Sequence, residues 1–520
     1  MDKDRPSATE NASLFYLFQQ RFSRHLSRPA VIGPEGTVDI TFADLEEGSA
    51  LYAGVLAKYG VQKGDRVVVQ VEKSARALLL YLACLRRGVI FVPLNTAYTA
   101  SEVDYFLENA APTLLVCRPE DSRDLLPCAQ RHAVRHTLTM DANGHGSFAD
   151  AATGCAPEPH VEVLGDDEVA AILYTSGTTG RSKGAMLTQR NLSSNVAVLH
   201  RVWRWQDDDV LLHALPIYHA HGLFVGCHLS LFNASPMIFL PKLDIDMLLA
   251  HLPRATVLMG VPTYYTRLLS TSDFTRELVQ HMRLFISGSA PLHRDTFRDF
   301  EQRTGQRILE RYGMTEAVMI TSNGYEAEQR IAGTVGPALP GVEARVVDQE
   351  GQIIASDKVG ALEIRGPNVF KGYWQMPEKT QEEFTQDAYF KTGDLATMAE
   401  DGRVTIVGRS KDLVISGGFN VYPKEVESLI DDVPGVIESA VVGVPHADFG
   451  EAVIAMVVCK ENRDPLAMTE EVMKVLNDKL ARFKQPKKIF CVEALPRNTM
   501  GKVQKNILRE EYKTCFSREA

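Results

Sequence analysis

Short runs of apolar and β-branched residues alternate with helical patterns through the first four-fifths of the chain. Clear examples lie at residues 169–175, 255–262 and 282–287, and each run is closed or directly followed by Ser, Gly or Pro. This alternation is typical of α/β layers, in which ligands bind at the loops that follow the carboxyl ends of the strands. The pattern therefore predicts a large α/β region.

The pattern changes twice towards the carboxyl end. Between residues 336 and 408, short strand-like runs are separated by turn signals such as PALPG and EDG, which favours a small β-rich subdomain. Beyond Arg409, strand and helix patterns mix, with helices expected at 423–430 and 470–480. We therefore expect an α/β fold with a large multi-subdomain N-terminal α/β domain (1–408) containing the small β-rich subdomain, a hinge (409–411) and a smaller, mobile C-terminal α+β domain (412–520).

Composition and charge narrow the function classes. The chain has 520 residues, of which 45% are hydrophobic and 23% charged, as in soluble globular proteins. Its longest unbroken apolar run, residues 77–85, is far shorter than the ~20 residues of a spanning helix, and the start shows no secretory or transit signal. The net charge of −10 argues against a nucleic-acid binder. We expect a cytoplasmic protein with neither nucleic acid nor a membrane as partner.

The eight cysteines are scattered and form no CxxC pair, which argues against structural zinc and a disulfide framework. The strongest local motif is TSGTTGRSKG, which directly follows the apolar run 169–175. Glycines let a backbone approach an anion, hydroxyls donate to phosphate oxygens, and Arg181 and Lys183 supply positive charge. The motif fits no register of a Walker A loop. It predicts a phosphate-binding loop of Thr175, Ser176, Gly177, Thr178, Thr179, Gly180 and Lys183.

Two further motifs carry groups suited to a nucleotide. In ERYGMTE, Tyr312 offers a flat face for a base, Gly313 allows close approach, Thr315 offers a hydroxyl, and Glu316 offers a hard oxygen ligand for Mg²⁺. In YFKTGDLA, Asp394 is expected on a turn, where it could accept hydrogen bonds from the hydroxyls of a sugar. Alone, each motif is weak, because a buried tyrosine beside a loop is common.

Two more motifs lie near the carboxyl end: GRSKDLVISGGFNVYPKEVE, which bridges the regions of different composition, and PRNTMGKVQK, in which Lys502 follows a glycine. In this order and spacing, the five motifs resemble the adenylate-forming superfamily of acyl-CoA synthetases, luciferases and adenylation domains. The resemblance extends from about Ser13 to Lys513. It implies an AMP-forming acid–thiol ligase that activates a carboxylate with ATP and Mg²⁺ and then transfers the acyl group to CoA.

The resemblance also implies roles for individual residues. The adenine and AMP site would consist of Gly288, Ser289, Ala290, Tyr312, Gly313, Asp394 and Arg409, and the loop that lines the CoA tunnel of Ser416, Gly417 and Gly418. Thr315 would contact the α-phosphate, and Glu316 would bind Mg²⁺. Lys502 would stabilise the negative charge that grows as the carboxylate attacks. Lys411, where many relatives have Asp, would be the hinge, and His219 would gate the approach of the thiol.

The acyl pocket decides which acid is activated. The stretch MGVPTYYTRLL places Arg267 a few residues beyond a predicted strand, and a cation near an acyl pocket needs a partner such as a second carboxylate on the substrate. Together with ERYGMTE and PRNTMGKVQKN, this stretch resembles the malonyl-CoA synthetases. The resemblance implies that Arg267 and Ser289 bind the distal carboxylate of malonate or methylmalonate. Ala317 departs from that family, in which the position is more polar.

The sequence therefore predicts a malonate–CoA ligase with malonate, ATP and CoA as substrates. An alternative is a ligase for another short-chain or aryl acid, with Arg267 turned outward. A nucleotide-binding scaffold without activity and an adenylation domain that loads a separate carrier protein are further alternatives. The sequence is compatible with a monomer or a homodimer.

Overall fold

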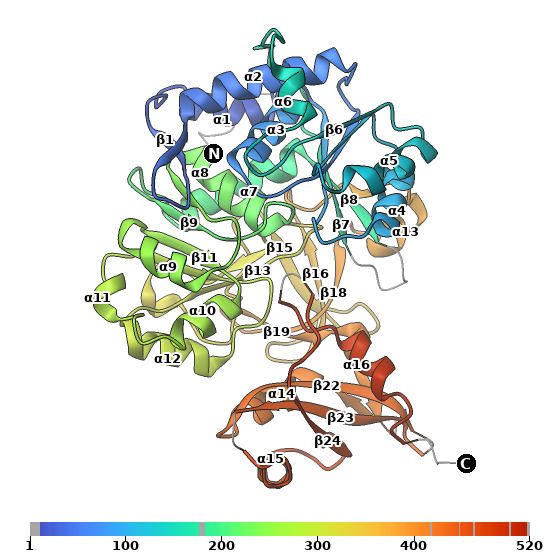
Figure 1. Ribbon diagram of the computed structural model, residues 1–520. Helices are drawn as coiled ribbons and strands as arrows, with labels where there is room; N and C mark the ends of the chain where they lie inside the picture. Colours follow the sequence, from blue (N-terminus) through green and yellow to red (C-terminus); the bar gives the residue numbers. More distant parts are fainter. Residues whose placement is uncertain are drawn as a thin grey trace.

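The protein folds into a large N-terminal domain, which contains three sheets, and a smaller C-terminal domain with a fourth sheet (Figure 1). This computed structural model describes residues 11–175, 182–416, 419–446, 448–460, 463–498 and 501–516. The architecture confirms the predicted mixed α/β fold class. Across these described residues, no helix has both the length and the apolar character that crossing a membrane requires.

One sheet of the N-terminal domain has seven strands, five of them adjacent and parallel. Their spatial order is β17 (Gly372–Tyr373), β8 (Lys183–Thr188), β7 (Val169–Thr175), β4 (Ile90–Pro93), β3 (Arg66–Gln70), β5 (Leu114–Cys117) and β6 (His136–Thr139). Its neighbouring helices are α2 (Phe42–Lys58), α3 (Ala75–Arg86), α4 (Ala100–Ala110), α5 (Ser122–Arg131) and α6 (Ser147–Ala152). Strand β7 has the bounds that the apolar run predicts.

The second sheet has eight strands, six of them adjacent and parallel. Their order is β14 (Thr321–Ser322), β13 (Leu309–Tyr312), β12 (Leu284–Ser287), β11 (Val257–Gly260), β9 (Leu211–His213), β10 (Met237–Phe239), β1 (Pro29–Ile32) and β2 (Val38–Thr41). The helices of this part are α1 (Leu14–Phe22), α7 (Gln189–Val202), the π-helix η1 (His221–Cys227), α8 (His228–Asn233), α9 (Ile245–His251), α10 (Pro262–Leu269), α11 (Arg276–Val279) and α12 (Arg294–Thr304).

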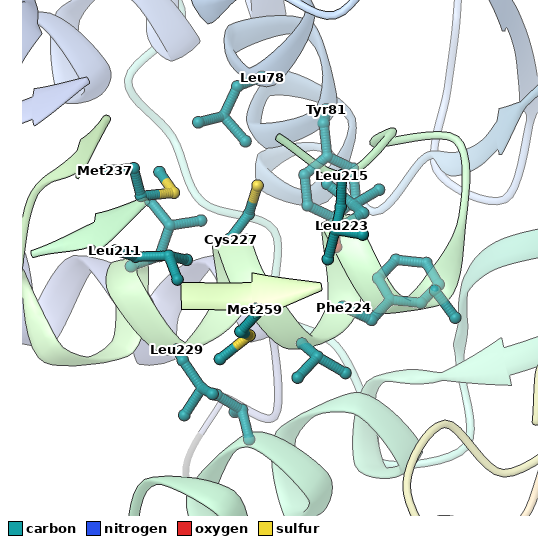
Figure 2. Packing of buried hydrophobic residues seen from close by; sticks show 14 of the residues in the cluster. Leu78, Tyr81, Leu211, Leu215, Leu223, Phe224, Cys227, Leu229, Met237 and Met259 are labelled. Atoms are coloured by element: carbon teal, nitrogen blue, oxygen red, sulfur yellow. The ribbon is translucent and has the colours of Figure 1, made fainter. Parts of the chain in front are cut away.

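A single hydrophobic cluster joins these two sheets. Helix α3, with the mainly apolar sequence ARALLLYLACLR, buries every residue except Arg76. Figure 2 shows Leu78 and Tyr81 of α3 in the same cluster as Leu211 of β9 and Cys227 of η1. Because α3 follows a strand of one sheet and η1 follows a strand of the other, this packing fixes the carboxyl ends of the two sets of strands relative to each other. Ligand sites of open α/β sheets lie at these ends.

The third sheet and the C-terminal domain follow in sequence. The third sheet is antiparallel, with strands β15 (Glu343–Val347), β16 (Gly360–Arg365), β18 (Phe390–Met398) and β19 (Val404–Arg409), and α13 (Pro377–Glu383) lies between β17 and β18 in the chain. This agrees with the predicted β-rich region. The C-terminal domain contains β20 (Val414–Ser416), β21 (Phe419–Val421), α14 (Pro423–Asp431), β22 (Val436–His446), β23 (Gly450–Cys459), α15 (Pro465–Lys479), β24 (Lys488–Val492) and α16 (Lys505–Tyr512).

The two domains touch at charged and polar groups. The His293 Nδ1 atom, at the start of α12, lies 3.1 Å from the Asp431 carboxylate of α14. A Cβ atom built on Gly501 would lie 3.3 Å from the Thr263 hydroxyl of α10. The loop that carries Lys502 therefore lies beside the helix that follows β11.

Candidate active site

The predicted AMP-binding residues Tyr312, Asp394 and Arg409 meet in the structure. Tyr312 ends β13, whereas Asp394 and Arg409 are paired residues of β18 and β19 in the third sheet. The Tyr312 hydroxyl donates a hydrogen bond to the Asp394 carboxylate, and the Arg409 Nε atom lies 2.9 Å from Asp394 Oδ1. Burial and the Asp394 charge hold the pKa of Tyr312 well above its ordinary value, so the hydroxyl stays protonated. The group offers a flat ring beside a buried carboxylate.

The loop after β12 contains the predicted residues Gly288, Ser289 and Ala290. A Cβ atom on Gly288 would lie 2.3 Å from the Arg311 guanidinium, so a larger residue cannot occupy this position without displacing that side chain. Ser289 adopts a left-handed backbone conformation (φ 69°), and its hydroxyl lies 3.3 Å from His221 Nδ1. A Cβ atom on Gly313 would lie 2.0 Å from the Val318 carbonyl oxygen, which explains the glycine in ERYGMTE.

Arg311 is a site residue that the sequence reasoning did not single out. It is the second residue of ERYGMTE and is 4% exposed, and its Nε and Nη2 atoms are buried without a hydrogen-bond partner among the described residues. Burial lowers the pKa of Arg311 to about 9, and the Tyr265 hydroxyl opposes this shift. An isolated buried cation is costly unless a ligand pairs with it. The Arg311 guanidinium is therefore a candidate for binding an anionic group of a ligand.

Two imidazoles lie beside Arg311. His219 and His221 come after β9, and burial followed by the Arg311 charge lowers the pKa of His219 to about 4. The same two effects hold the pKa of His221 well below its ordinary value, so both rings are neutral near pH 7. His219 Nδ1 and His221 Nε2 are buried and have no partner among the described residues. Neutral imidazoles with free nitrogen atoms can donate to or accept from a bound substrate.

Arg267, the predicted clamp of a distal carboxylate, lies on α10 with an exposed side chain. The residues that α10 buries are Tyr264, Tyr265 and Leu268, so Arg267 lies on the outer face of the helix. No carboxylate of the described residues forms an ion pair with it. The cost of burying an unpaired cation therefore applies to Arg311 and not to Arg267 in this structure, and the role of Arg267 as a carboxylate clamp stays a prediction. Ala317, the departure from the resemblance, is fully buried.

The structure describes the two ends of the predicted phosphate-binding loop, Thr175 and Lys183. Thr175 and Lys183 are paired residues of β7 and β8, and the Lys183 Nζ atom lies 4.2 Å from the centre of the Tyr373 ring and 3.7 Å from Glu383. The Tyr373 hydroxyl donates to Glu316 Oε1 at 2.9 Å. The other predicted residues of this loop, Ser176, Gly177, Thr178, Thr179 and Gly180, lie outside the described residues.

Glu316 has the chemistry that a magnesium ligand needs. Its carboxylate is 7% exposed, and burial raises its pKa, whereas hydrogen bonds and the charges of Arg409 and Lys183 act in the opposite direction. Within the described residues, no group of three or more His, Cys, Asp and Glu side chains could hold a metal ion. A single carboxylate is nevertheless enough to bind Mg²⁺ together with the phosphates of ATP, because Mg²⁺ keeps several water and phosphate ligands. Thr315 lies next to it, half-buried.

The predicted catalytic lysine, hinge and CoA-tunnel residues lie near the start and end of the C-terminal domain. Lys502 is exposed, and its ammonium group interacts with the charges of Arg409, Asp394, Lys411 and Asp412. Lys411 is exposed in the short 3₁₀ turn Ser410–Asp412, between the third and fourth sheets. Ser416 is buried at the end of β20, and Gly417 and Gly418 lie outside the described residues. Lys502 thus lies close to the predicted ribose-binding pair, whereas its separate role in catalysis stays a prediction.

Comparison with known families tests this combination of residues. The model of the AMP-binding enzyme family matches residues 18–374, and the model of the AMP-binding enzyme C-terminal domain matches residues 425–502. The chain belongs to the AMP-binding enzyme family. The first match includes Tyr312, Thr315 and Glu316, and the second ends at Lys502, whereas Asp394 and Arg409 lie between the two matched ranges.

Individual relatives of this AMP-binding enzyme are also informative. A malonate–CoA ligase from Arabidopsis thaliana is 35% identical over 484 residues, which cover 87% of this chain and 79% of the relative. A long-chain-fatty-acid–CoA ligase from Yersinia pestis is 32% identical, covering 98% of this chain and 95% of the relative. The crystal structure of ATP-bound MatB from Rhodopseudomonas palustris is 52% identical, with a TM-score of 0.94, and covers 98% of this chain and 100% of that chain.

Proposed function

We propose that the protein is an ATP-dependent malonate–CoA ligase. It converts malonate, ATP and CoA into malonyl-CoA, AMP and pyrophosphate through a malonyl-adenylate. The observation that carries the choice of acid is the buried Arg311 guanidinium, two nitrogen atoms of which have no partner in the part of the chain that the structure describes. The likeness to a malonate–CoA ligase and to MatB supports it.

Arg311 explains why the acid has two carboxylates. One carboxylate of malonate is consumed in the adenylate, and the other remains free to pair with the fork of Nε and Nη2, the bidentate geometry that guanidinium and carboxylate groups favour. A monocarboxylate of similar size would leave the cation buried and unpaired. A site built for a polar group rejects the analogue that lacks this group by about 10⁴-fold. Methylmalonate, with one more methyl group, is expected as a slower substrate, because such a difference costs about 1–3 kcal/mol.

The first half-reaction is adenylation. Lys183 and the loop that begins at Thr175 hold the β- and γ-phosphates, and Thr315 contacts the α-phosphate. Glu316 would hold Mg²⁺, which would supply positive charge to the phosphates. Asp394 accepts hydrogen bonds from the ribose hydroxyls, and Tyr312 and the loop after β12 hold the adenine. Lys502 approaches the α-phosphate and stabilises the charge that develops as the malonate carboxylate attacks.

The second half-reaction is thioester formation. The C-terminal domain turns about Lys411, which withdraws Lys502 and brings the loop of Ser416, Gly417 and Gly418 to the site, a hinge-type conformational step. The thiol of CoA then displaces AMP beside His219. The neutral His219 ring suits this role, since it leaves the approach of the thiol free of a second cation.

The strongest rival is a ligase for a longer or aromatic monocarboxylate. The relatives include a long-chain-fatty-acid–CoA ligase, so membership of the family alone does not select the acid. A long acyl chain needs an apolar tunnel, whereas the described side of this pocket presents Arg311, His219, His221 and Ser289. The polar lining favours the dicarboxylate.

A substrate screen tests the proposal. Pyrophosphate release is measured with acetate, malonate, methylmalonate, succinate, octanoate and benzoate, each with and without CoA. We expect malonate to give the highest kcat/KM and methylmalonate the second. If octanoate or benzoate is turned over better than malonate, the choice of a dicarboxylate is wrong. If no acid releases pyrophosphate, the protein is a nucleotide-binding scaffold.

A further prediction concerns Glu316. The Glu316→Gln variant should lower the rate of adenylation about a hundredfold, because the amide cannot neutralise Mg²⁺. Tyr373→Phe is the matched variant, since it keeps the carboxylate and removes only its hydrogen-bond donor, and it should cost about 1 kcal/mol, or roughly fivefold. Pyrophosphate release measured across a titration of Mg²⁺ checks both values. Equal rates for the wild type and Glu316→Gln would contradict the metal-binding role.

A further inference from the structure

A lysine and a histidine form a contact between the two parallel sheets. Lys73 follows β3 of the seven-stranded sheet, and His213 ends β9 of the eight-stranded sheet. The Lys73 Nζ atom lies 2.8 Å from His213 Nδ1 and donates to the His213 carbonyl oxygen at 2.7 Å. Among the described residues, no carboxylate forms an ion pair with Lys73. The Gly222 carbonyl oxygen beside Nε2 can only accept, so in the neutral ring Nδ1 acts as the acceptor from Lys73.

The second nitrogen of His213 contacts the π-helix η1. With Nδ1 as acceptor, Nε2 carries the proton and donates to the Gly222 carbonyl oxygen at 2.9 Å. The ring lies so close to the helix that a Cβ atom on Gly226 would be 2.8 Å from Nε2. A π-helix replaces the usual i to i−4 bonds and occurs frequently at functional sites. His213 therefore supplies a side-chain donor to a helix with unusual backbone bonding.

This helix carries the imidazoles of the acyl site. His221 is its first residue, and its Nδ1 atom lies 3.3 Å from the Ser289 hydroxyl. His219 lies two residues before it, and its carbonyl oxygen accepts from the Leu223 amide of the helix at 3.0 Å. His221 also interacts electrostatically with Arg311, His219 and His213. A shift of η1 would therefore move both imidazoles relative to Arg311.

We infer that Lys73 and His213 are positioning residues, which hold η1 in the register that places His219 and His221 against the acyl group. This inference rests on the proposed function, because it concerns the same acyl site. Lys73, which donates to Nδ1, favours the tautomer of His213 that carries its proton on Nε2. In this tautomer, the Nε2–H group points at the Gly222 carbonyl oxygen. The other tautomer would point a nitrogen lone pair at the carbonyl oxygen, which repels the helix.

Packing alone does not account for this pair. Its surroundings are apolar or weakly polar: Lys73 lies 4.2 Å from the centre of the Phe239 ring, and Cys227 Sγ lies 3.5 Å from His213 Nε2. An apolar pair of the same volume would fill this space without the cost of burying an ammonium group. The geometric property that an apolar pair cannot supply is a directed donor for Gly222.

The first test compares Michaelis constants. Lys73→Met keeps the length of the side chain and removes the donor, and we expect the KM for malonate to rise about tenfold, because small displacements of binding groups have large effects. The KM for ATP should stay within about twofold, since Tyr312, Asp394 and Arg409 are not attached to η1. Lys58→Met is the matched control, because Lys58 also donates to a carbonyl oxygen, that of Ala151 in α6. Equal changes of both constants, or no change, would overturn the inference.

The second test uses His213. A glutamine there can accept from Lys73 and donate to Gly222, so His213→Gln should keep most of the activity with malonate, whereas His213→Leu should match the loss of Lys73→Met. If both variants lose activity equally, the directed hydrogen bond is not the cause. The comparison of His213→Gln with His213→Leu also tests the inference if Lys73→Met does not fold.

The third test does not depend on the substrate. Histidine labelled with ¹⁵N reports the tautomer of His213, whose signals are those that disappear in His213→Leu. We expect the Nε2–H form in the wild type and its loss in Lys73→Met. An Nδ1–H form in the wild type would overturn the inference whatever acid the enzyme uses. Preference for another acid would overturn only the proposed function, and the KM comparison would then be made with that acid.

Discussion

Lys502→Ala should abolish most adenylation while leaving thioester formation from supplied malonyl-adenylate intact. The Lys502 ammonium group lies among the charges of Arg409, Lys411, Asp394 and Asp412, and it is exposed without a bound substrate. Its stabilising effect arises only as negative charge grows on the attacked phosphate, so its loss affects the transition state more than the binding of ATP. Removing one such electrostatic group typically costs about 10²–10³-fold in kcat.

The two half-reactions are measured separately. Pyrophosphate release reports adenylation, and conversion of synthetic malonyl-adenylate with CoA reports thioester formation. Lys513→Ala is the control, because Lys513 is an exposed lysine of the same domain that pairs with Glu510. The KM for ATP should change little in either variant. An equal loss of both half-reactions in Lys502→Ala would show that Lys502 serves the whole site, and the proposed withdrawal of this residue would be wrong.

Much of the fold follows from local patterns. β7 has the predicted bounds because its apolar run is closed by a hydroxyl- and glycine-rich loop. Helix α15 begins at Pro465 instead of residue 470, because Asp464 caps it by accepting from the amides of Leu466 and Ala467. The first turn holds a proline and an exposed leucine, Leu466, so its apolar residues do not mark the buried face of the helix. The contact between Tyr312 and Asp394, by contrast, joins two sheets whose relative position no local pattern contains.

Local sequence patterns also do not show whether Arg267 or Arg311 faces the acyl pocket. Arg267 follows a strand end closely in sequence, but the phase of α10, set by the burial of Tyr264, Tyr265 and Leu268, turns it outward. Arg311 lies in the strand LERY, in which two of four residues are charged, so the sequence does not reveal that the strand is buried and that the charge of Arg311 is costly without a ligand. Its neighbour Glu310 is buried as well, and burial raises the pKa of Glu310 to about 8. Strand alternation places the two side chains on opposite faces of the sheet.

Arg311→Met should remove most of the activity with malonate. Losing one partner of a buried, hydrogen-bonded charge pair costs about 2–5 kcal/mol, which corresponds to a fall of roughly 30- to 5,000-fold in kcat/KM. Methionine fills a similar volume without charge, so the site stays closed. The Arg267→Ala variant is the matched control, and its exposed position predicts kcat/KM within about threefold of the wild type. Arg311→Lys keeps a charge but not the fork, and it should lie between the wild type and Arg311→Met.

The Arg311→Met variant should be more stable than the wild type, although it is less active. Without ligand, Arg311 is a buried cation whose Nε and Nη2 atoms have no partner among the residues that the structure describes, so its replacement by methionine removes a desolvation cost. We therefore expect the thermal midpoint of ligand-free Arg311→Met to exceed that of the wild type, and the stabilisation by added malonate to disappear. Thermal unfolding with and without malonate, beside steady-state kinetics, measures both effects. If Arg267→Ala loses malonate activity and Arg311→Met keeps it, the distal carboxylate is bound at the outer face of α10, and the original assignment of the clamp to Arg267 is restored.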